Sequence, residues 1–238
     1  IGFARTKPSY EEDYKPDAPL TAKSGYGRGY TFPCLFKVGG DGWVLVSETG
    51  SHGNYPGCHI SDYDANKGYQ IAFPMKEEGD GIGSNNAVFS LPGSTPWRTI
   101  TVGKDLKPLV ETTIPYDVVE PRYEASQKYG VGKYAWSWLI WQDASCNYND
   151  QKQFIDLAAT MGYEYVLVDA LWDTQIGRDK IAELIRYAQS KGVSLMLWYN
   201  SNGVTNDAPQ GPRNCMDNIV ARKKEMAWMK SIGVKGIK

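Results

Sequence analysis

The sequence has few histidines, no closely spaced cysteines and no long hydrophobic run. Its two histidines, His52 and His59, are too few for a histidine-rich zinc site, and a histidine-based catalytic triad is disfavoured. The four cysteines show no C-x-x-C spacing, which argues against a zinc ribbon or a thioredoxin-type redox site. No apolar run approaches the roughly 20 residues of a membrane-spanning helix, so we expect no membrane span.

An excess of charge of one sign is also absent. Lys and Arg total 26, Asp and Glu total 27, and the formal net charge is −1. A nucleic-acid-binding surface needs concentrated positive charge, so we expect no nucleic-acid partner. Neither a phosphate-binding Walker loop nor a G-x-S-x-G nucleophile motif is present. Carboxylate chemistry remains as the main catalytic candidate.

Residues 1–125 are rich in Gly, Tyr, Ser and Pro and contain short runs of alternating polarity, such as 42–48 and 68–73. This period of two residues, bounded by Gly and Pro, predicts antiparallel strands and part of a β-sandwich. Cys34 and Cys58 flank a predicted hairpin. They are either a disulfide pair in an oxidising compartment or ordinary buried thiols.

Residues 126–238 alternate between predicted strands and helices. Apolar runs at 134–141, 165–168 and 194–199 predict parallel strands, and a fourth strand is expected from residue 234. Because no glycine-rich phosphate turn follows the first strand, the first half of a (β/α)8 barrel is favoured over a doubly wound sheet. The predicted fold class is therefore α+β multidomain, with a partial antiparallel β-sandwich followed by half of a TIM barrel.

Two amphipathic helices are expected between the first three strands, and a third helix is expected around 217–232, before the fourth strand. The first is predicted to begin at Asn149 or Asp150 and to end at Gly162. The apolar positions of the two helices, at spacings of three and four residues, are Phe154, Leu157, Ala158 and Met161 in the first and Ile181, Leu184, Ile185 and Ala188 in the second.

Polar and aromatic residues follow the predicted strands, where barrel enzymes place their substrate contacts. Asp169 comes directly after the 165–168 strand, Trp172 follows in the next loop, and Trp198 and Asn200 lie at the end of the 194–199 strand. Carboxylates and amides bind sugar hydroxyls, and tryptophans cover the apolar face of a sugar ring. We predict a sugar site from these four residues, although the two tryptophans are equally compatible with a core position. For Trp136 and Trp138 a core position is favoured.

Three segments together resemble glycoside hydrolase family 97, a family of bacterial α-glycosidases that includes α-galactosidases and α-glucosidases. They are TPWRTI at 95–100, FIDLAA and GYEYVLVD within 154–169, and WMKSIGVKGIK at 228–238. The resemblance implies an N-terminal β-sandwich, a catalytic barrel, a small C-terminal β domain and a calcium ion in the active site. It also implies that Glu48 is a calcium ligand, one contributor to the roughly six to eight oxygens that calcium takes.

The resemblance implies an enzyme that cleaves terminal α-linked sugars from an oligosaccharide or small glycoside. Segment 234–238 is similar to the retaining, α-galactosidase-like branch; an inverting α-glucosidase and a non-catalytic carbohydrate-binding protein are the alternatives. Retaining members carry an aspartate nucleophile just after this segment and an acid/base glutamate further along. We therefore expect both catalytic carboxylates beyond Lys238, and a chain of 238 residues that is inactive alone.

Two further expectations concern the surroundings of the chain. The resemblance implies a bacterial periplasmic or secreted protein. Both ends of the sequence look cut, and half of a barrel exposes the edges of its outer strands, so we also expect self-association through those edges.

Overall fold

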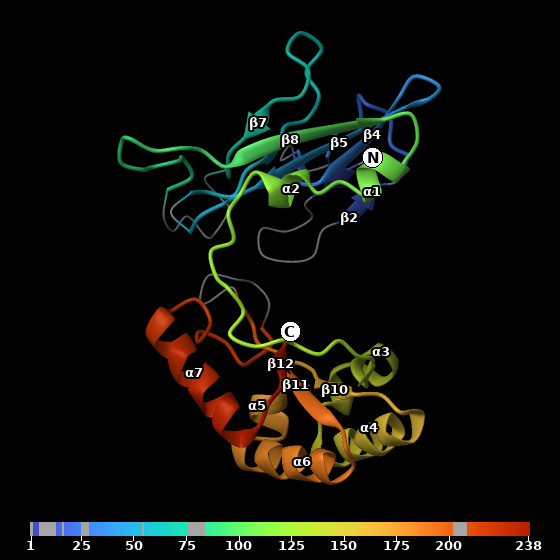
Figure 1. The fold of residues 1–238 in the computed structure, drawn as a ribbon, viewed down its shortest axis with the longest axis vertical. Coiled ribbons are helices and arrows are strands. Elements are labelled where there is room, and N and C mark those ends of the chain that lie inside the picture. The colour runs from blue at the N-terminus through green and yellow to red at the C-terminus, as the bar shows by residue number, and fades with distance from the viewer. Residues whose placement is uncertain are drawn as a thin grey trace. The chain divides into compact units, whose positions relative to one another are not determined.

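The computed structural model describes residues 2–4, 13–15, 17–24, 29–53, 55–75, 84–201 and 209–238. The chain divides into two compact units, Ile1–Ser126 and Gln127–Lys238, which are drawn in Figure 1. Among the described residues, no helix combines the length and the apolar character that crossing a membrane requires.

The first unit contains two antiparallel sheets. In spatial order, the larger consists of β2 (Asp13–Lys15), β1 (Gly2–Ala4), β3 (Tyr30–Thr31), β6 (His59–Ile60) and β7 (Ile71–Ala72), and the smaller of β4 (Cys34–Val38), β5 (Gly42–Thr49) and β8 (Trp97–Gly103). Two short helices follow, α1 (Lys107–Val110) and α2 (Ile114–Asp117). The prediction of antiparallel strands is confirmed, with the 42–48 run inside β5, whereas only two residues of the 68–73 run form a strand.

A small hydrophobic core joins strands of both sheets. Tyr30 and Ile60 come from the larger sheet, Cys34 comes from the smaller sheet, and all three are buried. Gly29 has a φ of +79°, and a Cβ at this position would lie 1.9 Å from the carbonyl oxygen of Ile60, so only glycine fits where β3 approaches β6. The four cysteines all lie in described ranges, and none of them forms a disulfide.

The second unit is built on a four-stranded parallel sheet. In spatial order its strands are β12 (Gly236–Ile237), β11 (Ser194–Leu197), β10 (Tyr165–Val168) and β9 (Tyr134–Trp136). The helices are α3 (Trp138–Trp141), the 3-10 helix η2 (Gln142–Ser145), α4 (Tyr148–Met161), α5 (Trp172–Gln175), α6 (Arg178–Ser190) and α7 (Ile219–Ile232). Helix α4 packs on β9 and β10 and α6 on β11, and Figure 1 shows the three long helices along the outside of the sheet.

The predicted strand at 134–141 is wrong beyond Trp136. Ser137 is buried, and its Oγ accepts hydrogen bonds from Ser145 Oγ at 2.8 Å and from Gln151 Nε2 at 2.9 Å. These polar anchors fold the chain back into α3 and η2, which leaves Leu139 and Ile140 exposed. The apolar run therefore marks a surface turn rather than the continuation of a buried strand.

Helix α4 also differs from its prediction. It begins at Tyr148, and Asn147 caps it by accepting a hydrogen bond from the Asp150 N–H at 3.0 Å. The buried stripe is Gln151, Phe154, Ile155 and Ala158, whereas the predicted core positions Leu157 and Met161 are exposed. The helix is rotated because Gln151 is drawn inward by its bonds to Ser137 and Ser145. For α6 the prediction is confirmed: Ile181, Leu184, Ile185 and Ala188 are all buried.

Candidate functional site

The carboxyl end of the parallel sheet gathers polar and aromatic side chains. We use this name, the carboxyl end, for Trp136, Asp169, Trp198, Asn200 and Lys238, which end or follow β9, β10, β11 and β12. The strands are held in register there, because the Trp198 N–H donates to the Val168 carbonyl and the Lys238 N–H donates to the Leu197 carbonyl, each at 3.0 Å. The predicted positions Asp169, Trp198 and Asn200 therefore follow adjacent strands.

Both carboxylate oxygens of Asp169 accept hydrogen bonds. Its Oδ2 accepts hydrogen bonds from the Trp136 indole N–H and from Lys238 Nζ, the latter at 3.2 Å. Its Oδ1 accepts from the Ala170 N–H at 2.7 Å. Only 4% of Asp169 is exposed, and a buried carboxylate requires such partners. Sequence reasoning identified the buried carboxylate but neither of its side-chain partners.

Trp136 contacts both Asp169 and Lys238. Its ring lies 3.9 Å from Lys238 Nζ and stacks on Trp138, with 5.6 Å between ring centroids and 17° between planes. The sequence interpretation of Trp136 as a core residue followed from extending its strand to residue 141. Because β9 ends at Trp136, this residue lies at the end of a strand. Asp169, Trp198 and Asn200 were predicted as site residues from the same kind of position.

Trp172, predicted to contact substrate, lies in the hydrophobic core of the second unit. It is 0% exposed, so neither face of its ring is open in this structure. Its indole N–H donates to the Trp198 carbonyl at 2.8 Å, and its ring stacks on Trp228 with 5.7 Å between centroids. Trp172 thus supports Trp198, which is itself partly exposed.

Asn200 is buried and connects the carboxyl end to residues 210–212. Its Nδ2 donates to the Gln210 carbonyl at 3.2 Å, and its backbone N–H donates to the Pro212 carbonyl at 3.0 Å. The Leu171 N–H donates to the Gly211 carbonyl at 2.8 Å. Residues 210–212 therefore tie together the segments that follow β10 and β11.

A buried thiol, that of Cys146, is hydrogen-bonded to the backbone of Asp169. Cys146 is 1% exposed, and its Sγ donates to the Asp169 backbone carbonyl at 2.9 Å. Burial raises the pKa of Cys146 to about 12, and the nearby carboxylate of Asp169 acts in the same direction. The thiol therefore stays protonated at neutral pH and remains a donor to this carbonyl.

Glu48, the predicted calcium ligand, lies in the first unit on β5, opposite Arg98 on β8. Its Oε2 is 2.9 Å from Arg98 Nε, an ion pair without hydrogen-bond alignment, and its Oε1 accepts from Ser51 Oγ at 3.1 Å. Within the described ranges, no group of three or more His, Cys, Asp or Glu residues is arranged to hold a metal. Because calcium takes about six to eight oxygens, these residues alone do not form a calcium site.

Comparison with protein families matches both units. The family described as Glycosyl-hydrolase 97 N-terminal matches residues 1–121, and the family Glycoside hydrolase 97 matches residues 128–238. A probable retaining alpha-galactosidase from Streptomyces bingchenggensis is 26% identical over 88% of this chain and 31% of its own length. A retaining alpha-galactosidase from Bacteroides thetaiotaomicron is 27% identical over 97% of this chain and 37% of its own length. The chain thus spans about a third of these relatives.

Solved structures give a nearer relative. A crystal structure of a beta-arabinopyranosidase is 58% identical, covers 100% of this chain and 38% of its own, and superposes with a TM-score of 0.89. A glycoside hydrolase family 97 enzyme from Pseudoalteromonas sp. strain K8, in complex with acarbose, is 19% identical, covers 99% of this chain and 36% of its own, and has a TM-score of 0.63. At that identity the second likeness concerns the fold alone.

Proposed function

Because this chain belongs to glycoside hydrolase family 97, we propose that it forms the N-terminal domain and the start of the catalytic domain of a retaining glycosidase that removes terminal sugars. The observation that carries the substrate class is the 58% identity with a beta-arabinopyranosidase, beside 26% and 27% with two retaining alpha-galactosidases. We therefore propose terminal β-L-arabinopyranosides as first substrates and α-D-galactopyranosides as second.

The two substrates are chemically consistent with one site. A β-L-arabinopyranoside and an α-D-galactopyranoside have the same configuration at the anomeric carbon and at the three hydroxyl-bearing ring carbons, and differ in the hydroxymethyl group that only the galactoside carries. A site that binds the shared hydroxyls accepts both, and discriminates by the room left for the additional group. The α-glucosidase alternative is not favoured, because the 58% identical structure is that of a beta-arabinopyranosidase.

For the domains, we propose that residues 1–125 belong to a β-sandwich and residues 126–238 to the first half of a (β/α)8 barrel. The supporting observation is that β9 to β12 lie in chain order in one parallel sheet. In such barrels the reacting groups lie at the carboxyl ends of the strands. Asp169, Trp198 and Asn200 accordingly belong to the sugar site, and Trp172 to the layer beneath it.

For catalysis, we propose that the two carboxylates of a retaining mechanism follow Lys238 in the longer protein. One would attack the anomeric carbon, and the other would protonate the departing oxygen and then activate water. We propose Glu48 as one calcium ligand, with the remaining calcium glutamates following Lys238 in the longer protein. The 238 residues alone are then expected to give no turnover.

The proposal is tested by assaying the full-length protein with nitrophenyl β-L-arabinopyranoside, α-D-galactopyranoside and α-D-glucopyranoside. We expect kcat/KM to be highest for the arabinopyranoside, lower for the galactoside and lowest for the glucoside. A highest value for the glucoside would overturn the substrate class. Sugar binding in calorimetry without hydrolysis of any glycoside would overturn the enzyme and favour a carbohydrate-binding protein.

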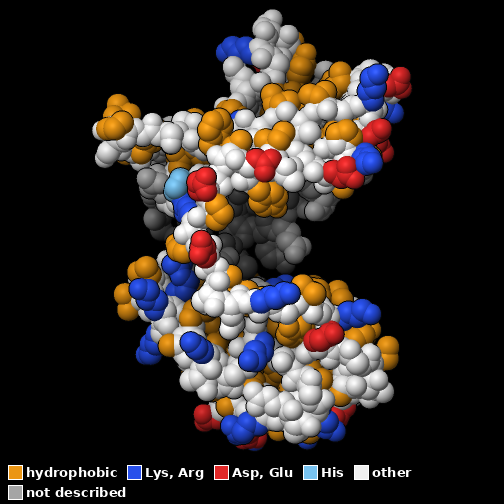
Figure 2. Space-filling model, in the orientation of Figure 1, with side chains coloured by type: hydrophobic (Ala, Val, Ile, Leu, Met, Phe, Trp, Pro, Cys, Tyr) orange, Lys and Arg blue, Asp and Glu red, His pale blue; other side chains and the backbone are white. Residues whose placement is uncertain are grey.

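We also propose a periplasmic or secreted location and self-association of the isolated chain. Within the described residues, β9 and β12 have no strand neighbour on their outer sides, and unpaired strand edges pair readily with another chain. Figure 2 shows exposed hydrophobic side chains on the second unit as well. Size-exclusion chromatography of the 238 residues should give an oligomer, and a monomer would contradict this proposal. Cell fractionation of the source bacterium tests the location.

A further inference from the structure

Gln151 is a buried amide on helix α4, outside the group of residues that form the carboxyl end. Helix α4 packs on β9 (Figure 1), and none of the Gln151 surface is exposed. Its Nε2 donates to Ser137 Oγ at 2.9 Å and to the Ser145 carbonyl at 2.8 Å. Its Oε1 accepts no hydrogen bond from any described residue. An unpaired buried oxygen costs stability, so stability alone is a weak reason for an amide at this position.

The two serines bound by this amide stand next to two residues that hold Asp169. Ser137 directly follows Trp136, whose indole N–H donates to Asp169 Oδ2. Ser145 directly precedes Cys146, whose Sγ donates to the Asp169 backbone carbonyl at 2.9 Å. A shift of either serine would therefore be transmitted to Asp169.

Gln151 also closes the turn between these serines. Ser137 precedes α3, Ser145 ends η2, and Ser145 Oγ donates to Ser137 Oγ at 2.8 Å. Inside the turn, Gln142 has a φ of +56° and a ψ of −155°, a conformation that is costly for residues other than glycine. Such a backbone persists only where the surrounding structure holds it. Gln151 supplies that restraint from the neighbouring helix, because its donors bind both ends of the turn.

We propose that Gln151 is a positioning residue of the sugar site: through the turn 137–145 it fixes the Trp136 indole that orients the Asp169 carboxylate. The path to the carboxylate runs through Trp136, because Cys146 binds only the backbone carbonyl of Asp169. This inference rests on the proposed function, which assigns Asp169 to the sugar site. It deepens that function by naming a buried residue on which the geometry of the site depends.

The test compares Gln151→Met with Ile155→Val in the full-length protein. Methionine is unbranched like glutamine, so it fills the same space without the amide donors. Ile155 is the matched control, because it is also fully buried, one turn further along α4, and has no polar group. With nitrophenyl β-L-arabinopyranoside, Gln151→Met should lower kcat/KM about 10-fold, since a displaced site residue costs much of the rate. Ile155→Val should stay within about 2-fold of the wild type, since loss of one buried methyl mainly affects stability.

A double substitution separates positioning from a general loosening of the core. Trp136→Phe removes the indole N–H that holds Asp169. In this background Gln151→Met should lower kcat/KM by only about 2-fold, because the effects of residues in one hydrogen-bond network do not add. Ile155→Val should have the same effect in both backgrounds. An effect of Gln151→Met that stays at about 10-fold in Trp136→Phe would overturn the proposal.

Fluorine NMR of the protein labelled with 5-fluorotryptophan reports on the ring of Trp136 without any turnover. The resonance that is absent from Trp136→Phe belongs to this ring. It should move or broaden in Gln151→Met and in Ser137→Ala, which removes the hydroxyl that Gln151 binds, and it should stay in place in Ile155→Val. A resonance that stays in place in both Gln151→Met and Ser137→Ala would also overturn the proposal.

Two further measurements separate the possible failures. The thermal midpoint identifies a variant that does not fold, and Ser137→Ala replaces Gln151→Met in every comparison if that variant fails. If the wild type hydrolyses the arabinopyranoside and Gln151→Met behaves like Ile155→Val, the inference about Gln151 fails while the proposed function stands. If the folded wild type hydrolyses none of the nitrophenyl glycosides, the proposed function fails, and the fluorine resonance alone decides whether Gln151 fixes Trp136.

Discussion

Arg178 and Glu225 form a two-bonded ion pair beneath the carboxyl end of the sheet. Arg178 Nη2 donates to Oε1 and Oε2 of Glu225 at 2.7 and 2.8 Å, joining the start of α6 to α7. The Arg178 guanidinium also lies 4.2 Å from the ring centroid of Trp228, which stacks on Trp172. The Tyr199 hydroxyl donates to the same carboxylate at 3.0 Å. This network ties Tyr199, which lies between Trp198 and Asn200 in the sequence, to helices α6 and α7.

Replacing Tyr199 with Phe removes the hydroxyl that Glu225 accepts from, without changing the shape of the ring. Tyr199 is 4% exposed, so the lost bond to a charged group should lower the free energy of unfolding by about 1.5–3 kcal/mol. Tyr187→Phe is the control, because its hydroxyl donates to Asp156 at the surface at 2.6 Å. Urea unfolding monitored by tryptophan fluorescence measures the free energy of unfolding of both variants. An equal fall in the two variants would contradict the expectation that the buried hydrogen bond of Tyr199 contributes more than the surface bond of Tyr187.

Cys146 predicts a loss of stability at alkaline pH. Burial raises the pKa of its thiol to about 12, so the folded state keeps a proton that the unfolded chain releases near its ordinary pKa of about 8.5. The free energy of unfolding should therefore fall as pH rises between these values, by up to about 1.4 kcal/mol per pH unit for this one group.

Cys146→Ser keeps a donor for the Asp169 carbonyl but does not titrate in this range. Its unfolding free energy should decline less steeply with pH than that of the wild type, although the raised pKa of Tyr199 leaves both proteins with some decline above about pH 10. Unfolding titrations at a series of alkaline pH values measure the two slopes. Parallel slopes would show that the Cys146 thiol does not contribute.

Asn147 rather than Asn149 should matter for helix α4. The Asn147 side chain accepts from the Asp150 N–H at 3.0 Å, and loss of such a cap costs about 1 kcal/mol. Asn147→Ala should lower the urea midpoint accordingly. Asn149→Ala, at an exposed position inside the helix, should leave it unchanged or raise it, because alanine favours helix. A larger fall in the urea midpoint for Asn149→Ala than for Asn147→Ala would mean that the helix begins at Asn149 or Asp150, as the sequence alone predicts.

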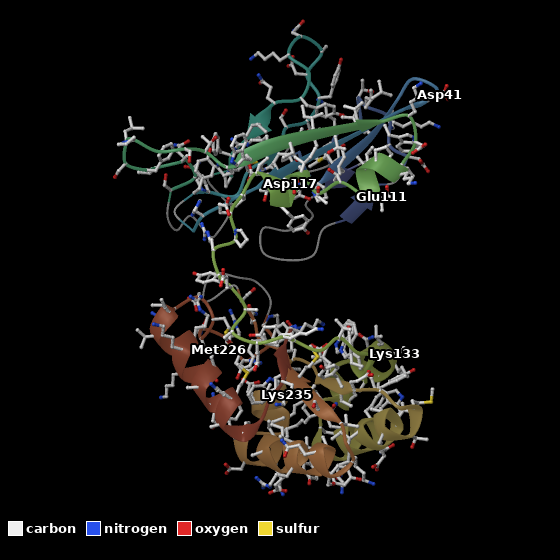
Figure 3. The ribbon with its side chains drawn as sticks, in the orientation of Figure 1. Asp41, Glu111, Asp117, Lys133, Met226 and Lys235 are labelled. Atoms are coloured by element: carbon white, nitrogen blue, oxygen red, sulfur yellow. The ribbon has the colours of Figure 1, made fainter. Side chains whose placement is uncertain are left out.

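Calcium removal tests the proposed role of Glu48. In the full-length protein, calcium should raise the thermal midpoint after treatment with a chelator, because a ligand that binds only the folded state stabilises it. Glu48→Gln should weaken this stabilisation. Glu111→Gln, at an exposed carboxylate after α1 (Figure 3), should not. An identical calcium response in both variants would contradict Glu48 as a ligand.

The sequence was informative where one periodicity dominated. The runs at 165–168 and the stripe Ile181, Leu184, Ile185 and Ala188 predict β10 and the buried face of α6 correctly, because hydrophobic burial alone determines them. Asp169 was recognisable because a carboxylate after a buried strand requires partners.

The missed features depend on polar contacts between distant residues. The bonds of Ser137 to Ser145 and Gln151 end β9 early and rotate α4, and no local pattern of hydrophobicity contains this information. Lys238 and Trp136 meet Asp169 only through the order of the strands, across 69 and 33 residues of sequence. Trp172 and Trp198 look equivalent in the sequence, and the burial of Trp172 against Trp228 distinguishes them in the structure.

The most direct test of the central claim follows the cleavage of nitrophenyl β-L-arabinopyranoside by the full-length protein with proton NMR. The anomeric proton of the first sugar released distinguishes retention from inversion before the anomers equilibrate. A retaining glycosidase of the proposed substrate class predicts release of arabinose with β-arabinopyranose as the first anomer formed. Release of α-arabinopyranose first, or no release of arabinose by a folded protein, would contradict the account.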